Sequence, residues 1–154
     1  MVEDIVGDVL KEFEKLPSYD LELGVISSNT SRKDTSGVTN AELMFIHENG
    51  SPLNNIPARP ILDITINYVN KELLDKIIDK SIIAFNKNFD ENEFKKELEK
   101  NAIRIENISR KIIYANKGIL VPNSPRVAKA KGGNHPLFDT GQLARSITCR
   151  VVEN

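Results

Sequence analysis

The chain has 154 residues, of which 40% are hydrophobic and 28% charged, and its formal net charge is −1. This composition is typical of a globular protein that can bury one modest core. A dedicated nucleic-acid binder normally has a clear basic excess, and no apolar run reaches the roughly 18 residues that span a bilayer. We therefore expect neither a membrane-spanning protein nor a conventional DNA-binding domain.

The beginning of the chain predicts a helix, a strand and a polar loop. Apolar residues recur at three- and four-residue spacing over 2–16, so an amphipathic helix is expected there, ending before Pro17. The acidic character of this segment is not that of a signal peptide. Alternating residues over 19–27 predict a strand, and the Ser/Thr-rich stretch 27–40 predicts an exposed loop.

Residues 39–50 allow two interpretations. Thr39 followed three residues later by Glu42 matches a capping box, and Gly50 matches a helix C-terminal cap. Alternation over 43–47 would instead fit a strand. Because signals for both ends of a helix are present, a short helix is the prediction.

Two long helices are predicted next. Helical periodicity covers roughly 61–86 and 91–115, and Asp90 with Glu93 forms a second capping-box pattern at the turn between them. The following stretch, 116–138, is rich in proline and glycine and has no periodicity. It is expected to be a long irregular loop, which in a compact domain is usually functional or ordered by a partner.

The chain closes with a predicted short helix and a strand. Asp139 and Gln142 form a third capping-box pattern, and residues alternate over 146–153. The last strand can pair only with 19–27 or with a neighbouring subunit. Two strands make a marginal sheet, so either further strands lie near 27–45 or another copy completes the sheet.

These elements predict an α+β fold with a small antiparallel sheet, two long helices, an N-terminal helix and long extended loops. No internal repeat or domain boundary is visible, so the whole chain, 1–154, is interpreted as a single domain.

The residues that could carry chemistry do not form a recognisable catalytic or metal-binding pattern. A zinc-protease helix needs a second histidine four residues after His47, but Ser51 occupies that position, and the other histidine, His135, lies in the proline/glycine loop. Cys149 is the sole cysteine, which suits a reducing compartment. There is no phosphate-binding loop and no nucleophile elbow, so we expect no enzyme activity, metal or cofactor, and we interpret His47-Glu48 as a helix end.

The segment Pro57-Ala58-Arg59-Pro60 is better explained by backbone geometry. The two prolines fix their own φ angles and keep the residues before them extended, and Pro60 is suited to the first position of a helix. The guanidinium of Arg59 could bind a carboxylate or backbone carbonyls. Whether this clamp acts within the chain or between subunits is left open.

Two motifs together resemble a known family. The first is His47-Glu48-Asn49-Gly50 followed by Ile56 to Pro60 and Leu62. The second contains Pro136, Leu137, Asp139, Thr140, Gly141, Gln142, Leu143, Ser146 and Ile147. This combination resembles the tail-completion or neck proteins of tailed bacteriophages, also called tail-component or virion-morphogenesis proteins. Departures from the family pattern are Asn49, where an aromatic residue is usual, and Ile61, where phenylalanine is usual.

The resemblance implies a structural virion protein of the head–tail interface. It implies a ring, usually of about six copies, that completes the tail and joins it to the capsid connector or adaptor, with the tail terminator or tube as a further partner and no membrane. Assembly in the host cytoplasm and residence in the virion neck or tail follow. Gly141 would let another backbone approach closely, and Arg59→Ala or Leu143→Asp would disrupt assembly. A non-virion assembly chaperone is the alternative.

Three basic residues, Arg126, Lys129 and Lys131, have two possible interpretations. They are either a solvated loop or, if repeated around a ring, cations that face DNA passing through its lumen.

Overall fold

The computed structural model describes residues 2–26, 37–115 and 117–154, and its fold is α+β as predicted. Most of the predicted loop 27–40 lies outside the described residues. The elements in chain order are α1 (Val2–Glu14), β1 (Tyr19–Val25), α2 (Asn40–Asn49), the 3₁₀ helix η2 (Pro52–Asn54), α3 (Ile61–Glu72), α4 (Leu74–Asn86), α5 (Glu91–Ala115), α6 (Pro125–Lys131), α7 (Gln142–Ser146) and β2 (Ile147–Glu153).

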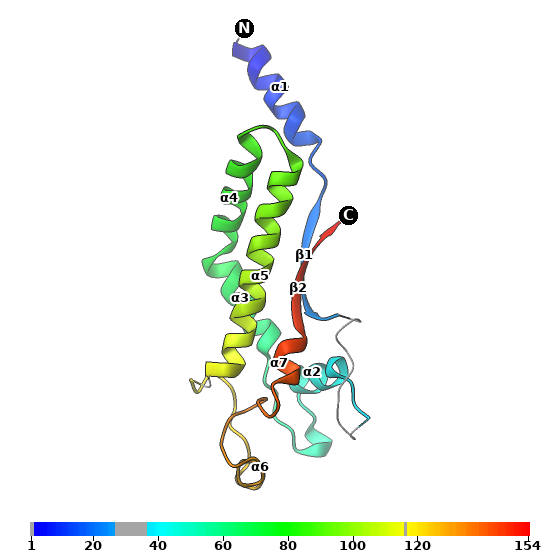
Figure 1. Cartoon of the computed structure of the whole chain (residues 1–154), viewed down its shortest axis with the longest axis vertical. Helices are drawn as coiled ribbons and strands as arrows, with labels where there is room; N and C mark the ends of the chain where they lie inside the picture. The colour runs from blue at the N-terminus through cyan, green and yellow to red at the C-terminus, as the bar shows by residue number, and fades with distance from the viewer. Residues whose placement is uncertain (1, 27–36, 116) are drawn as a thin grey trace.

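The long helix α5 is the centre of the molecule. Figure 1 shows α3 and α4 along one side of it and the β1–β2 ribbon along the other. Its buried positions recur at helical spacing: Leu98, Ala102, Ile105, Ser109 and Ile112. One core cluster joins α5 to α3, α4 and the ribbon, and a second joins its C-terminal end to α2 and α7. The periodicity of α5 therefore sets the position of both halves of the molecule.

The sheet joins the two ends of the sequence. β1 and β2 are antiparallel, with Tyr19 opposite Glu153 and Val25 opposite Ile147. Of the two partners that the sequence left open for the last strand, the structure shows the first strand. Within the described residues the sheet has two strands, and α5 packs against one of its faces through residues such as Cys149. That packing supplies the support that a two-stranded sheet needs.

The prediction of one helix over 61–86 is wrong. At Leu73 the backbone leaves the helical region, with φ −126° and ψ −25°, and α3 gives way to α4. Neither proline nor glycine causes this break. Leu73 is buried in the same core cluster as Val69 and Ile77, so the bend lets both helices pack along α5.

The prediction that 116–138 is irregular throughout is also wrong, because it contains α6. The Ser124 hydroxyl accepts a hydrogen bond from the Val127 N–H (3.4 Å), Pro125 opens the first turn, and Gly132 ends the helix at φ +69°. These start and stop signals are present in the sequence, but the helix has only seven residues. It is too short to produce a periodic pattern.

Of the three predicted capping boxes, the one before α2 forms completely and the one before α5 forms in part. In α2 the Thr39 hydroxyl accepts from the Glu42 N–H (3.2 Å) and the Glu42 carboxylate accepts from the Thr39 N–H (2.8 Å), so the capping box and the short helix are confirmed. Before α5 the Asp90 carboxylate accepts from the Asn92 N–H (2.9 Å). The Glu93 side chain instead pairs with Lys96.

Candidate functional site

The segment that follows α2 turns back on itself, and Gly50 permits this turn. Gly50 has φ +74°, and a Cβ added there would lie 2.8 Å from the backbone nitrogen of Ala58. Both the left-handed backbone and the close approach therefore favour glycine. A backbone hydrogen bond from the Arg59 N–H to the His47 carbonyl (2.6 Å) closes the turn.

Glu48 caps the helix that follows this turn. Its two carboxylate oxygens accept hydrogen bonds from the N–H groups of Leu62 (3.2 Å) and Asp63 (2.9 Å). A carboxylate at a helix N-terminus satisfies unpaired donors and interacts favourably with the helix dipole. The helix begins at Ile61, as its periodicity predicted, and Pro60 is its N-cap residue. The motif is a corner that orients α3.

Arg59 acts as a clamp within the chain. Its Nε donates to the Val121 carbonyl (2.7 Å) and its Nη2 to the Pro122 carbonyl (3.0 Å), and only 5% of the residue is exposed. Burial lowers the pKa of the guanidinium from its ordinary value, but arginine remains charged at neutral pH. Of the two alternatives left open by the sequence, the structure therefore selects the intramolecular one.

The second motif bends sharply before the last helix and strand. Leu137 has φ +60°, an uncommon conformation for a bulky residue, and it is buried in the core next to the buried Pro136. Gly141 has φ +75° and is the N-cap of α7.

The predicted capping box of this second motif is wrong. The Gln142 side chain donates to the Thr140 hydroxyl (3.1 Å), and no side chain caps α7, which begins at Gln142. Gly141 also lies close to side chains of its own chain. A Cβ there would meet the Arg145 guanidinium at 2.8 Å and two further side chains, so glycine is favoured by its φ and by side-chain packing.

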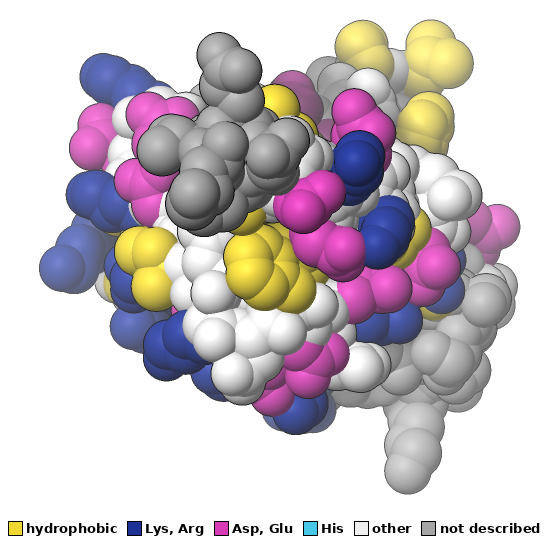
Figure 2. All heavy atoms as spheres, turned by 90° about the horizontal axis from the view of Figure 1, so that it is seen from above, with side chains coloured by type: hydrophobic (Ala, Val, Ile, Leu, Met, Phe, Trp, Pro, Cys, Tyr) yellow, Lys and Arg dark blue, Asp and Glu magenta, His cyan; other side chains and the backbone are white. Residues whose placement is uncertain are grey.

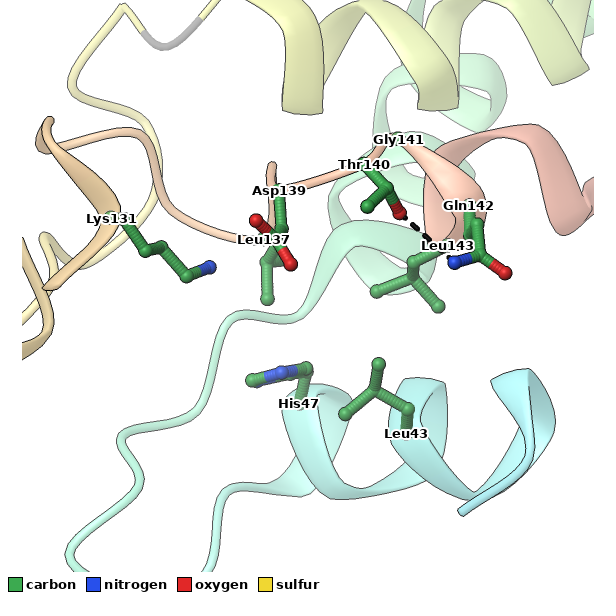
Figure 3. Close-up of a pocket in the computed structure, with 9 residues that line it drawn as sticks. All are labelled: Leu43, His47, Lys131, Leu137, Asp139, Thr140, Gly141, Gln142 and Leu143. Atoms are coloured by element: carbon green, nitrogen blue, oxygen red, sulfur yellow. Dashed lines mark hydrogen bonds between the residues drawn. The ribbon is translucent and has the colours of Figure 1, made fainter. Parts of the chain in front are cut away.

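The structure brings the two motifs together. Figure 3 shows His47 and Leu43 of α2 facing the 137–143 segment across a small cavity. The cavity has a volume of about 160 Å³, and Lys131 and Asp139 also line it. Leu143 belongs to the buried core cluster, and the partly buried Leu43 packs against that cluster. Residues about 90 positions apart in the sequence thus form one junction.

Arg110 makes a second arginine clamp that the sequence did not reveal. Its guanidinium donates to the carbonyls of Ala144 (3.2 Å), Arg145 (3.2 Å) and Ile147 (2.9 Å), where α7 passes into β2. Glu106, one turn earlier on α5, pairs with Arg110 at 2.7 Å. The partners of Arg110 are backbone carbonyls distant in sequence, which leave no residue pattern to detect.

His135 fastens the proline/glycine loop to the end of α5. Its Nε2 lies 2.7 Å from the Ile113 carbonyl, to which it donates in the tautomer protonated at that nitrogen. Its ring lies 4.9 Å from that of Phe138, and Phe138 in turn packs edge-on against Tyr114. Both histidines are therefore placed at structural joints.

The three basic candidates are not equivalent. Arg126 and Lys129 are exposed on α6, whereas Lys131, at the end of the helix, donates to the Phe138 carbonyl (3.4 Å). Figure 3 shows the Lys131 side chain extending toward the cavity between the motifs. All three side chains are exposed, and Lys131 also contributes to the junction, so Arg126 and Lys129 are the better candidates for contact with an external partner.

Comparison of the chain with known protein families, with curated proteins and with solved structures gave no match. In the part of the chain that the structure describes, no three His, Cys, Asp or Glu side chains are grouped to hold a metal. No helix there is both long and apolar enough to cross a bilayer. The polar groups of the two motifs mainly bind backbone, so the arrangement holds elements in fixed orientation.

Proposed function

We propose that this protein is a structural component of the neck of a tailed bacteriophage, without catalytic activity. In this proposal it is a ring subunit that completes the tail and joins it to the capsid connector. The observation that carries the proposal is that the two motifs of the family resemblance form a single junction. If the two motifs belong together, their residues are expected to meet in the structure although they are distant in sequence.

The chemistry of the junction supports a structural role. Glu48 caps a helix, Arg59 binds two carbonyls, and Gly50 lets two backbone segments touch. An acid–base or nucleophilic site would instead need polar groups directed at a reacting molecule. A ring subunit needs surfaces in fixed relative orientation, which these contacts provide.

Exposed apolar residues next to the junction are candidates for contact with the neighbouring protein. Leu53, on the turn η2, is 97% exposed, and Phe45, on α2, is 70% exposed. Arg59 and Leu143, expected as assembly residues from the sequence, are 5% and 3% exposed. Their replacement would damage the fold, so assembly is better tested at Leu53 and Phe45.

The partners in this proposal are other copies of the chain, the connector or adaptor proteins, and the tail terminator or tube. Arg126 and Lys129 are the residues we assign to contact with DNA in the lumen, since both are exposed cations on one short helix.

The test is the content of purified virus particles. Heads, tails and intact particles are separated, and this chain is quantified in each by mass spectrometry. About six copies per particle, travelling with tails or intact necks, are expected for a ring of this kind. Absence from mature particles together with abundance in the lysate would overturn the proposal in favour of an assembly chaperone.

A further inference from the structure

A second cavity adjoins the junction, between the corner that follows α2 and the helix α6. It has a volume of about 180 Å³, and it shares the lining residues His47, Lys131 and Leu137 with the junction cavity. The rest of its lining comes from the corner, within 55–59, and from the segment that enters α6, within 123–127. Figure 1 shows α6 at the end of the molecule opposite α1.

The lining of this cavity is positively charged. Arg59 and Lys131 both line it, and among the described residues no Asp or Glu does. Neither cation forms an ion pair with a residue that the structure describes. Figure 2 shows a different arrangement at the far end of the molecule, where acidic and basic side chains are intermixed on the surface. At the cavity the chain instead leaves two cations without a counterion.

Arg59 is buried without a carboxylate to balance its charge. Only 5% of the residue is exposed, and its Nε and Nη2 donate to two backbone carbonyls. Burial alone lowers the pKa of its guanidinium, with no acidic neighbour to oppose the effect. A buried cation is unfavourable unless it is paired. Its Nη1 has no hydrogen-bond partner among the described residues, so it can still donate to an anion.

The other lining residues supply an amide and apolar walls. The Nδ2 of Asn123 is buried and has no hydrogen-bond partner within the described part of the chain, so this amide can turn toward a ligand without breaking a bond in the protein. Ile56, Pro57 and Val127 are apolar. Pro57 and Val127 are also exposed, so the cavity opens to solvent on that side. A matching ligand combines a negative group with a short apolar part.

We propose that this cavity binds a small organic carboxylate. The Arg59 guanidinium and the Lys131 ammonium supply charge-assisted hydrogen bonds to its oxygens, and its apolar part lies against the walls. Inorganic phosphate would leave those walls uncovered. Pockets for drug-sized ligands have volumes of roughly 300–1,000 Å³, whereas this one has about 180 Å³, so the ligand has only a few carbon atoms.

Two sources present this chemistry: a free short-chain acid and the side chain of a glutamate on a neighbouring protein. Both place a carboxylate at the end of a short apolar chain. The inference stands without the proposed phage function, because it uses only the shape and charge of the cavity.

The experiment is titration of the full chain, labelled with ¹⁵N, with sodium butyrate at constant ionic strength, followed by NMR. Butyramide has nearly the same shape without the charge, and sodium phosphate is the inorganic anion for comparison. Butyrate is expected to bind saturably with a Kd of about 1–10 mM, and to shift the signals of the Arg59 Nε and the Asn123 side-chain amide. Butyramide and phosphate should each bind at least about tenfold more weakly.

Two variants test the assigned residues. Asn123→Ala and Lys131→Gln should each weaken butyrate binding at least about fivefold. Arg59 is left in place because it holds the corner. Lys129→Gln is the matched control, because it removes the same charge from the same helix at a position that does not line the cavity. It should leave butyrate binding unchanged. Thermal unfolding of each variant separates loss of binding from loss of folding.

A further probe distinguishes the two sources. N-acetyl-glutamate amide carries a single charge, on the side-chain carboxylate, and so imitates a glutamate within a protein. If it binds at least as tightly as butyrate and is weakened by the same variants, the ligand is a side chain of a neighbouring protein. If it binds more weakly than butyrate, the ligand is a free acid.

Several results would overturn the inference. These are a butyrate titration without saturation up to about 100 mM, butyramide or phosphate that binds as tightly as butyrate, and an equal loss of binding in Lys129→Gln. Equal binding of butyramide would show an apolar cavity that does not select charge. Equal loss in the control would mean that only the net charge of α6 matters. Particle composition tests the neck function separately.

Discussion

Gly50 is favoured over other residues both by its positive φ angle and by the close approach of another backbone segment. Gly50→Ala places a methyl group 2.8 Å from the Ala58 nitrogen in a backbone with φ +74°. We expect a loss of about 2–3 kcal/mol in the free energy of unfolding, from strain and the forced separation of the two segments. Urea unfolding followed by circular dichroism measures it. Gly118→Ala is the control, because Gly118 has φ +73° but open space around it. Equal losses in both variants would show that the contact with Ala58 contributes nothing.

The Arg59 clamp depends on the shape of the guanidinium as well as on its charge. Arg59→Lys keeps the charge but cannot bind the Val121 and Pro122 carbonyls together. A loss of about 1–3 kcal/mol is expected, since a partly buried acceptor is left without its donor. Arg126→Lys, at an exposed position, should change the free energy of unfolding by less than about 0.5 kcal/mol. If Arg59→Lys is as stable as the parent in the same urea titration, the clamp interpretation is wrong.

The two arginine clamps differ in how far the sequence revealed them. Arg59 lies between prolines, and this stiff setting indicated a guanidinium held against a fixed partner. Arg110 lies in the middle of a regular helix, where an arginine is ordinarily a solvated side chain. Its partners are carbonyls 34 to 37 residues away, and carbonyls are common to every residue. Only the folded arrangement identifies such a contact.

At the scale of the elements, the capping box at the N-terminus of α2 should make the stability of the fold depend on pH. Hydrogen bonds from the backbone and then the side chain of Thr39 lower the pKa of Glu42 below its ordinary value of 4.5. A carboxyl whose pKa is lower in the folded state stabilises the fold above its unfolded pKa. That contribution is lost as the pH falls through the lowered value.

Stability measured at about pH 6 and about pH 3 tests this behaviour. Glu42→Gln keeps a side chain that fits the capping box but removes the charge. The stability of this variant should therefore decrease less on acidification than that of the parent. Glu99→Gln, on an exposed position of α5, should leave the parent's pH dependence nearly unchanged. An identical pH dependence in parent and Glu42→Gln would contradict the prediction.

The packing of β2 against α5 can be followed through Cys149. Burial, and then the charge of Glu106, raise the pKa of this thiol to about 11. Because the thiolate is the reactive form, alkylation at about pH 8 should be at least about a hundredfold slower in the folded chain than in urea. Adding Ala130→Cys on exposed α6 should give one fast and one slow thiol. A folded parent that reacts as fast as the unfolded chain would show that β2 separates readily from α5.

Elements with complete local signals were predictable from the sequence, and those determined by packing were not. The α2 helix carries a capping box and a terminal glycine, and both strands alternate clearly, so their positions were correct. The break at Leu73 lies in an uninterrupted helical pattern and follows from packing on α5. The start of α7 was misplaced because its capping-box pattern coincides with a glycine at φ +75°.

At the scale of the whole molecule, the proposed neck function depends on surfaces that the fold leaves uncovered. Leu53 is almost fully exposed at the tip of the corner that Gly50, Glu48 and Arg59 hold in place. An apolar side chain held at the tip of a rigid corner is available for contact with a neighbouring protein, where its burial would be favourable. This arrangement suits a subunit that inserts the tip into a neighbouring protein.

Leu53→Ser tests this use of the corner without disturbing the core. The variant should fold and melt like the parent, since Leu53 is 97% exposed, but particles made with it should contain much less of the chain and fewer joined tails. Ile83→Ser, at a 60% exposed position on α4, is the control for loss of surface hydrophobicity alone. Mass spectrometry of purified particles and electron microscopy of tail attachment give the two readouts. Normal incorporation of Leu53→Ser would remove the corner from the assembly interface. Equal loss in both variants would mean that incorporation depends on general surface hydrophobicity and not on this tip.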